Sequence, residues 1–240
     1  MPLILPHGFL SQQGGSPIVP DFRGAASDTS TSASNPKIAI ITNGPAVEAL
    51  RPYIACVVWA GSVAISTCEL NQFGESAGNG ETMTPITSQL IDSSNFRSIQ
   101  FFKVERSMPG GVGNTCAIIS TFPSSVTLYG AALWDLGEEG IDRLPVDTAN
   151  DSGSGSVGAR SAAVTVGAGG CILAGYASRE DSGTAAAVTW TNATERFDAA
   201  VSNSLRHSFA DISGLNKGAR TITATPADTE DQNVLQLIAF

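Results

Sequence analysis

Residues 187–240 alternate short runs of strand-forming residues with turn residues, and no other feature of the sequence limits the fold as strongly. The runs are V-T-W-T, L-R-H-S-F-A-D-I, A-R-T-I-T-A-T and N-V-L-Q-L-I-A-F, and Gly, Asn, Asp and Pro lie between them. Such punctuated runs are typical of antiparallel strands in a sandwich or barrel. We therefore expect an all-β fold, an antiparallel jelly-roll-like β-sandwich, whose last core strand ends at Phe240.

The first part of the chain contains similar runs. Residues 53–59 are almost continuously apolar, which predicts a strand buried on both faces. We expect 62–68 to be its hairpin partner through a two-residue turn. A second hairpin is expected between 115–122 and 125–131, around a proline. Residues 44–51 have a proline near their start, which suits a short helix or a turn.

The stretch 147–158, D-T-A-N-D-S-G-S-G-S-V-G, has the composition of a flexible connector. It could separate two domains, because 240 residues suffice for one large β domain or two small ones. However, neither side clearly carries a whole sandwich, and Greek-key folds need long crossing loops. We favour one sandwich domain over 37–240, with any sub-boundary at this Ser/Gly loop.

Residues 1–36 are rich in proline, serine and threonine and predict an extended N-terminal arm. Their few large apolar residues are too isolated to form a core of their own. We expect these residues to contact a neighbouring subunit; the alternative is an arm that lies along its own domain. The interface residues predicted for the arm are Leu3, Ile4, Phe9, Ile18 and Phe22.

Composition excludes some classes of function. The chain has 13 basic and 22 acidic residues, for a net charge of −9, and its basic residues are scattered. A nucleic-acid interface needs a basic patch, so we expect no nucleic-acid partner. The sequence has no signal peptide and no run of ~20 apolar residues, so we expect no membrane partner and synthesis in a cytoplasm. The four cysteines form no C-x-x-C motif and are expected to be free, buried thiols.

Candidate catalytic groups are few. Residues 153–158 match G-x-G-x-x-G, but a dinucleotide site needs a strand before this motif and a helix after it. A glycosidase needs two facing carboxylates, and Glu195 and Asp198 would point to opposite sides of an ideal strand. His207 is the only histidine outside the arm, and no G-x-S-x-G motif accompanies it. We predict no catalytic residue and no enzyme.

No cofactor and no metal site is predicted either. Two histidines and unpaired cysteines do not suit zinc. Asp147, Asn150 and Asp151 could gather around Ca²⁺, although their spacing is not that of an EF-hand, and an ordinary Asx-rich turn is the alternative.

The tryptophans leave two interpretations open. Trp59 lies in the apolar run and is expected in the core. Trp134 and Trp190 are either core residues or an exposed ligand platform, because binding sandwiches stack sugars on exposed indoles.

The segments V-T-W-T-N-A-T-E-R-F-D and T-I-T-A-T-P followed by N-V-L-Q-L-I-A-F resemble the ending of a loose group of proteins from tailed phages and prophages of proteobacteria. The stretch S-G-S-G-S-V-G-A-R-S-A-A-V-T-V-G-A-G-G-C-I-L-A-G-Y-A is similar to their penultimate strands. The resemblance covers about 97–240 and implies a virion structural β-sandwich without catalytic residues to carry over.

We therefore expect a non-enzymatic structural protein of a tailed-phage virion, localised to the virion after assembly in the host bacterial cytoplasm. The leading expectation is a homo-oligomeric head decoration or cement protein, or another accessory capsid protein, attached to capsid or tail subunits through its arm. The alternative is a tail fibre or spike module that binds a host receptor or surface glycan. A lyase or glycosidase is a third hypothesis and requires two carboxylates in one cleft.

Overall fold

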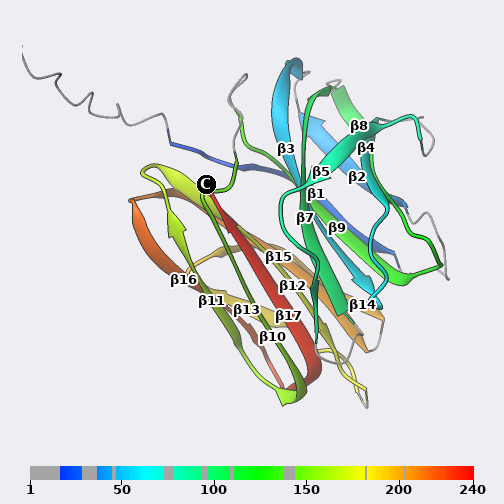
Figure 1. Cartoon of the computed structure of the whole chain (residues 1–240), viewed down its shortest axis with the longest axis vertical. Helices are drawn as coiled ribbons and strands as arrows, with labels where there is room; N and C mark the ends of the chain where they lie inside the picture. Colours follow the sequence, from blue (N-terminus) through cyan, green and yellow to red (C-terminus); the bar gives the residue numbers. More distant parts are fainter. Residues whose placement is uncertain are drawn as a thin grey trace, which may run out of the picture.

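The computed structural model describes residues 17–28, 37–44, 47–72, 78–92, 97–108, 111–137, 144–181, 183–202 and 204–240. These residues form antiparallel β-sheets and contain no helix, which confirms the all-β, jelly-roll-like expectation (Figure 1). Within these ranges there is accordingly no helix long and apolar enough to cross a membrane.

The first half of the chain forms one jelly roll. Its outermost strands pair with each other and each following pair nests inside: β1 with β9, β2 with β8, β3 with β7 and β4 with β5. Such nested pairing folds a long hairpin into the two Greek keys of a jelly roll. The strands are β1 (Asp21–Asp28), β2 (Lys37–Gly44), β3 (Val47–Ala60), β4 (Thr67–Gln72), β5 (Glu81–Pro85), β6 (Leu90–Ile91), β7 (Arg97–Met108), β8 (Gly111–Thr121) and β9 (Thr127–Asp135).

The second half repeats this topology. Here β10 pairs with β17, β11 with β16 and β12 with β15. The sheet order is β10-β17-β12-β15-β14, opposite a three-stranded sheet β11-β16-β13. The strands are β10 (Asp147–Val157), β11 (Arg160–Val166), β12 (Gly170–Arg179), β13 (Val188–Thr191), β14 (Thr194–Ser202), β15 (Leu205–Leu215), β16 (Gly218–Pro226) and β17 (Glu230–Ala239).

Each jelly roll has its own apolar core, and a third core lies between them. In β3, Tyr53, Ala55, Val57 and Trp59 face the interior of the first jelly roll, whereas the alternate residues face the second one. In β12, Cys171, Leu173 and Ala177 face the core between the jelly rolls. Ile172, Ala174 and Tyr176 face the interior of the second jelly roll. Side chains point alternately to the two faces of a strand, so a strand between two cores must be apolar throughout.

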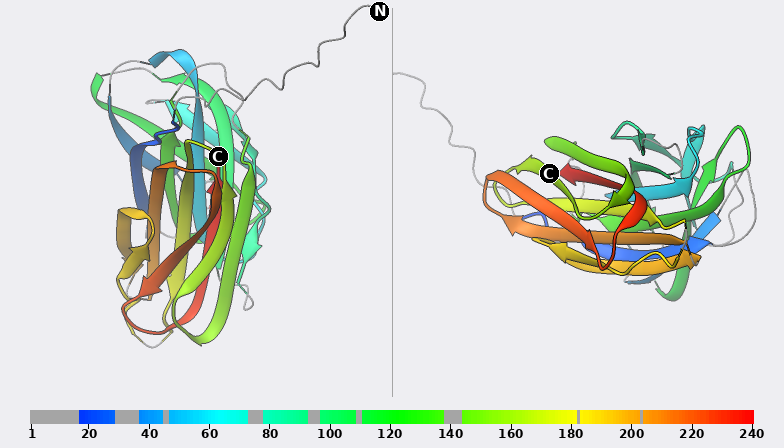
Figure 2. Two further views of the ribbon diagram at one scale, coloured as in Figure 1. Left: turned by 90° about the vertical axis from the view of Figure 1, so that its left-hand side faces the viewer. Right: turned by 90° about the horizontal axis from the view of Figure 1, so that it is seen from below.

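We call the contact between the two jelly rolls the seam. It joins sheet β1-β9-β3-β7 to sheet β10-β17-β12-β15, and Figure 2 shows the strands of the second half (yellow-green to red) gathered beside those of the first. At Gly175 in β12, an added Cβ would lie 2.4 Å from Cys56 Sγ and 2.7 Å from Ile99 Cδ1. A glycine there lets β12 approach β3 and β7 closely.

One expectation about the domains is corrected. The single sandwich domain over 37–240 stays a prediction, because the two halves have their own cores but also share a third one. The expected Ser/Gly loop at 147–158 is largely β10, which pairs with β17 from Asp147 to Ser154. β10 is the edge strand of its sheet, and its pairing with β17 satisfies its backbone hydrogen-bonding groups despite its small side chains.

The two predicted hairpins are also wrong. β3 pairs with β7 and β9, and β4 pairs with β5 and β8, so β7 and β5 lie between β3 and β4 in one nine-stranded sheet. β8 and β9 likewise do not pair with each other. No short helix forms over 44–51, because the described residues there end β2 and begin β3.

Three expectations about the core are confirmed. The run 53–59 is buried on both faces, and β17 is a buried strand that ends at Phe240. Trp59 is 1% exposed. All four cysteines are free and buried, and burial raises the pKa of the Cys68 thiol to about 12.

Candidate functional site

The segment that was expected to bind a neighbour is in part a strand of this chain. Residues 21–28 form β1, which pairs with β9 along its length. Ile18 N donates a hydrogen bond to Gly169 O at 2.7 Å, and Ile18 and Phe22 both pack against the seam core. Ile18 and Phe22 are thus partly buried against their own chain, and their role as interface residues stays a prediction. Leu3, Ile4 and Phe9 lie outside the described residues.

Trp134 is the centre of the seam and not an exposed platform. It is 0% exposed, and its ring centroid lies 5.7 Å from that of Phe22, 6.5 Å from Phe101 and 6.3 Å from Phe209. Phe209 belongs to the second jelly roll, so the indole joins both halves. The interpretation of Trp134 as a ligand platform is wrong, because no face of the ring is accessible.

The indole of Trp134 also joins the halves by a polar contact. Its Nε1 donates to Asp211 Oδ2 at 2.9 Å, and the same carboxylate accepts two hydrogen bonds from Arg196, each 2.9 Å long. Asp211 is 1% exposed, so its charge depends on these donors. The pKa of Arg196 is raised, chiefly by its hydrogen bond to Asp211.

A second buried carboxylate connects β9 to the start of β3 and to β1. Asp135 accepts hydrogen bonds from Arg23 and from Gly137 N, and Arg51 Nη1 lies 3.3 Å from its Oδ2. Because Asp135 is 0% exposed, loss of Arg23 would leave much of its charge uncompensated. β1 is thus held by an ion pair as well as by its ladder.

His207 connects the two halves at another point of the seam. Its Nδ1 is hydrogen-bonded to Ser27 Oγ in β1 at 2.9 Å, and it is 1% exposed. Burial, with a smaller contribution from the positive charge of Arg97, lowers the pKa of His207 to about 3. The imidazole is therefore neutral and structural at neutral pH.

We expect this histidine to make the protein sensitive to acid. The unfolded chain binds a proton at His207 with a pKa near 6.5, whereas the folded chain resists protonation down to about pH 3. The stability contributed by the neutral histidine is complete above pH 6.5 and is lost as the pH falls toward 3. Between pH 7 and pH 4, the wild-type chain should lose about 3 kcal/mol more free energy of unfolding than His207→Asn. Urea unfolding at both pH values measures this difference, and equal losses in the two chains would contradict it.

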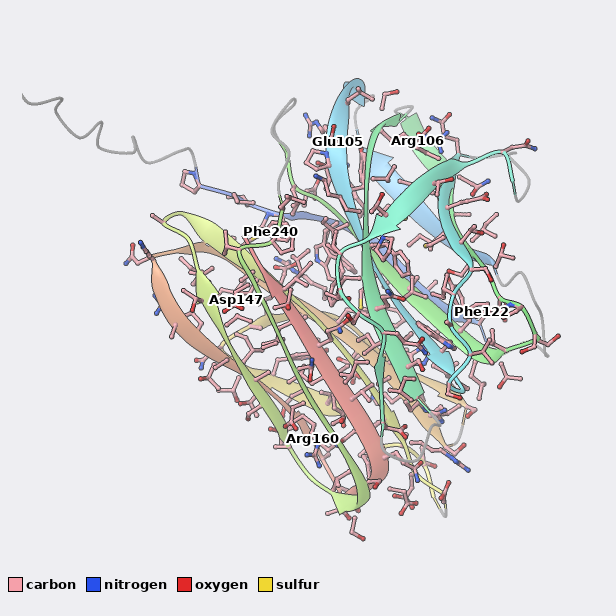
Figure 3. The ribbon with its side chains drawn as sticks, viewed as in Figure 1. Glu105, Arg106, Phe122, Asp147, Arg160 and Phe240 are labelled. Atoms are coloured by element: carbon pink, nitrogen blue, oxygen red, sulfur yellow. The ribbon has the colours of Figure 1, made fainter. Side chains whose placement is uncertain are left out.

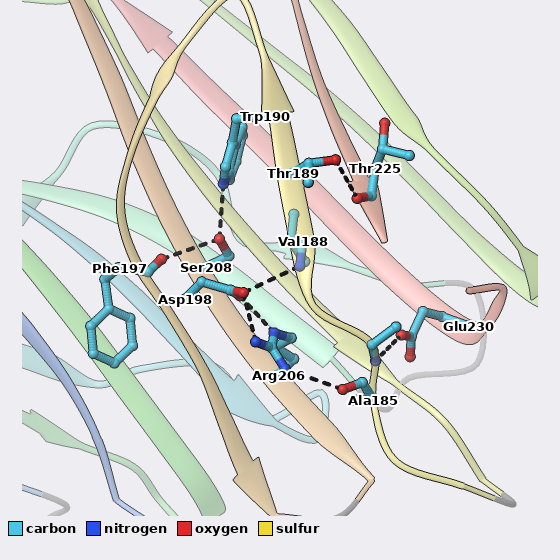
Figure 4. A network of polar contacts seen from close by, with 11 residues as sticks. Ala185, Val188, Thr189, Trp190, Phe197, Asp198, Arg206, Ser208, Thr225 and Glu230 are labelled. Carbon is cyan, nitrogen blue, oxygen red and sulfur yellow. Dashed lines mark hydrogen bonds and ion pairs between the residues drawn. The ribbon is translucent and has the colours of Figure 1, made fainter. Parts of the chain in front are cut away.

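Trp190 belongs to a polar network that closes the second jelly roll (Figure 4). Its Nε1 donates to Ser208 Oγ at 2.8 Å, and Ser208 in turn donates to Phe197 O at 3.1 Å. Its ring meets Tyr176 edge-on at 6.5 Å. The indole is half-buried, and its role as a ligand platform remains a prediction.

An ion pair completes this network. Arg206 binds both oxygens of Asp198, at 2.7 and 2.6 Å, and donates to Ala185 O at 3.3 Å. Asp198 also accepts from Val188 N at 3.2 Å. β13 pairs with β16 and β14 pairs with β15, so these side-chain contacts link two strands that share no ladder.

The other candidates from the sequence have structural surroundings. Burial and the charge of Asp198 raise the pKa of Glu195, but Asp198 itself is bound by Arg206. Asp147 accepts hydrogen bonds from Thr148 N and Thr165 N, and these lower its pKa. Among the described residues, no three His, Cys, Asp or Glu side chains are placed to hold a metal ion. The G-x-G-x-x-G stretch falls mostly within β10, without a following helix.

The exposed large apolar residues lie at one end of the molecule, which we call the connector end. In the described part of the chain these are Val19, Leu50, Leu144 and Val146, with exposed fractions of 64, 55, 63 and 61%. They flank the starts of β1, β3 and β10, where β9 and β17 end. Figure 3 shows Phe240, Glu105 and Arg106 toward this end and Arg160 toward the other.

A shallow groove adjoins the connector end. It encloses about 400 Å³ and is lined by Leu144, Ile86 and Val104 together with charged and polar residues of β5 and β7. Clusters of exposed apolar residues mark contact surfaces more often than single ones do. This end is the part of the described surface best suited to bind another protein.

Sequence reasoning missed most of these residues. Asp211 carries no local signal, because Trp134 lies 77 residues away from it along the chain. The sequence gives a weak indication that Leu144 and Val146 are exposed, because they flank a proline and their other neighbours are charged.

Comparison with protein-family models finds no match for this chain, and neither does a search of curated proteins.

Proposed function

We propose that this chain is a non-enzymatic structural subunit of a virion, a head decoration or cement protein or another accessory capsid protein. The observation that carries the proposal is the exposure of the four large apolar residues that flank the starts of β1, β3 and β10. In this proposal Leu3, Ile4 and Phe9 add to the contact with a neighbouring subunit.

The fold is compatible with this role but does not select it. Jelly rolls occur in viral capsid proteins, lectins and cupins, so function must be argued from a surface. The two jelly rolls share an apolar seam. A chain with this shared core and exposed apolar side chains at one end suits a subunit that attaches to a neighbour and catalyses no reaction.

The test removes the apolar side chains and leaves the cores intact. A chain with Leu50→Ser, Leu144→Ser and Val146→Ser should fold as the wild type does but lose incorporation into tailed-phage particles. Quantitative mass spectrometry of purified particles measures incorporation, and thermal unfolding measures the fold. Val157→Ser, at the opposite end of β10, is the matched control and should incorporate normally. Normal incorporation of the triple variant would reject attachment through the connector end.

The tail fibre or spike alternative has lost one of its two proposed platform residues, because Trp134 is buried. Trp190, which is half-buried, still allows a test of this alternative. Binding on a glycan array that Trp190→Ala abolishes would favour this alternative over a capsid role.

A further inference from the structure

A second cavity opens on the seam at the end opposite to the connector end. We call it the seam pocket. It encloses about 360 Å³, and its lining comes from both jelly rolls: Ala60, Gly61, Arg97, Thr127, Leu128, Arg179, Ser204 and Leu205. Ala60 pairs with Arg97 and with Thr127, and Arg179 pairs with Leu205, so the pocket lies over the last rungs of three ladders. Small-molecule sites are common at such contacts between domains.

The lining of the seam pocket carries two positive charges and no carboxylate. Arg97 is 3% exposed, and the side chain of Arg179 is 27% exposed. Arg179 pairs with Asp181 at 2.6 Å, and the charges of Asp92 and Asp181 both act on Arg97, but neither carboxylate is part of the lining.

The charges of these arginines affect the pKa values of buried groups nearby. Burial and the charge of Arg179 lower the pKa of Arg97 to about 9. The charge of Arg97 in turn contributes to the lowered pKa of His207. The positive charge of Arg179 therefore disfavours the charged form of Arg97, Asp92 and Asp181 oppose this effect in part, and an anion bound beside Arg97 would stabilise its charge further.

The backbone of the pocket is also unusual. Leu128 has a φ of 55°, and a large non-glycine residue rarely adopts this left-handed conformation. It lies where the register between β3 and β9 shifts, and Gly61 opposite has a φ of 102°. Strained residues and bulges of this kind concentrate where a fold positions a ligand.

We propose that the seam pocket binds a small oxyanion, a phosphate or a carboxylate, with Arg97 and Arg179 as its ligands. Planar guanidinium groups bind both anions through charge-assisted hydrogen bonds. Thr127 and Ser204 supply hydroxyl groups to the same cavity. A free phosphate and an acidic or phosphorylated sugar share this chemistry, and the experiment below distinguishes them. The binding itself does not depend on the proposed virion role, because the isolated chain can be tested.

The experiment titrates the purified chain by calorimetry at constant ionic strength. The probes are inorganic phosphate, glucose 6-phosphate and glucuronate, with glucose as the neutral control. We expect saturable binding of at least one anionic probe and none of glucose. Arg179→Gln should weaken the binding at least about tenfold, because it removes a charged hydrogen-bond donor. Arg97→Gln should do the same if it folds, and the more exposed Arg179 keeps the test valid if it does not.

The matched control is Arg220→Gln in β16, whose guanidinium bonds to Ala219 O and Asn216 O and is remote from the pocket. It should bind as the wild type does. Binding by phosphate alone would assign the site to a free ion, and preference for glucose 6-phosphate or glucuronate would assign it to a sugar acid. Absence of saturable binding, or equal weakening by Arg179→Gln and Arg220→Gln, would overturn the proposal.

Discussion

Replacement of Trp134 by alanine is expected to lower the free energy of unfolding by about 3–5 kcal/mol. The indole is fully buried between three phenylalanine rings, one of them in the other jelly roll. The variant leaves a cavity at the seam and removes one donor from the buried carboxylate of Asp211. Because the cavity lies between two cores, we also expect the two jelly rolls of this variant to unfold in separate transitions. Urea unfolding followed by circular dichroism measures both effects.

Trp134→Phe separates the two causes. It fills most of the cavity but cannot donate to Asp211, so it should cost about 1.5–3 kcal/mol, the value of a lost hydrogen bond to a charged group. A loss below about 1 kcal/mol for Trp134→Ala would mean that the seam does not stabilise the molecule.

Deletion of residues 1–28 is the second change with a large expected effect. It removes β1 and with it the Phe22 ring against Trp134, the Ser27 contact to His207 and the Arg23 partner of Asp135. Loss of one partner of a buried ion pair alone costs about 3–5 kcal/mol. We expect a chain that begins at residue 29 to be poorly folded at 37 °C, with the edge of β9 exposed to aggregation.

The control is a chain that begins at residue 17. It keeps every contact described for β1 and should unfold at the temperature of the intact chain. Differential scanning calorimetry of the two truncated chains makes the comparison. If both deletions left the melting temperature unchanged, β1 would not be part of the stable fold.

The positions of many strands could be predicted from the local sequence. Alternation of apolar residues in β11 and β16 matches sheets with one buried face, and continuous apolar runs in β3 and β17 match strands between two cores. These patterns depend only on which face of a strand is buried, and a residue carries that information in its own side chain.

The pairing of the strands could not be predicted in this way. We expected β3 with β4 and β8 with β9 to form hairpins, because they follow each other closely in the sequence. In the structure, other strands of the nine-stranded sheet lie between these neighbours, and β1 pairs with β9 more than 100 residues away. The Ser/Gly stretch of β10 shows the same limit, since its strand conformation comes from β17 and not from its own residues.

By itself, then, the sequence determined an all-β class, the free buried thiols and the core strand that ends at Phe240. Only the tertiary structure decided that there are two jelly rolls, that Trp134 lies in the seam and that Arg97 and Arg179 share a pocket. The physical reason is the distance along the chain. Burial of a residue follows from its own chemistry, whereas a partner many residues away is chosen by the packing of whole sheets.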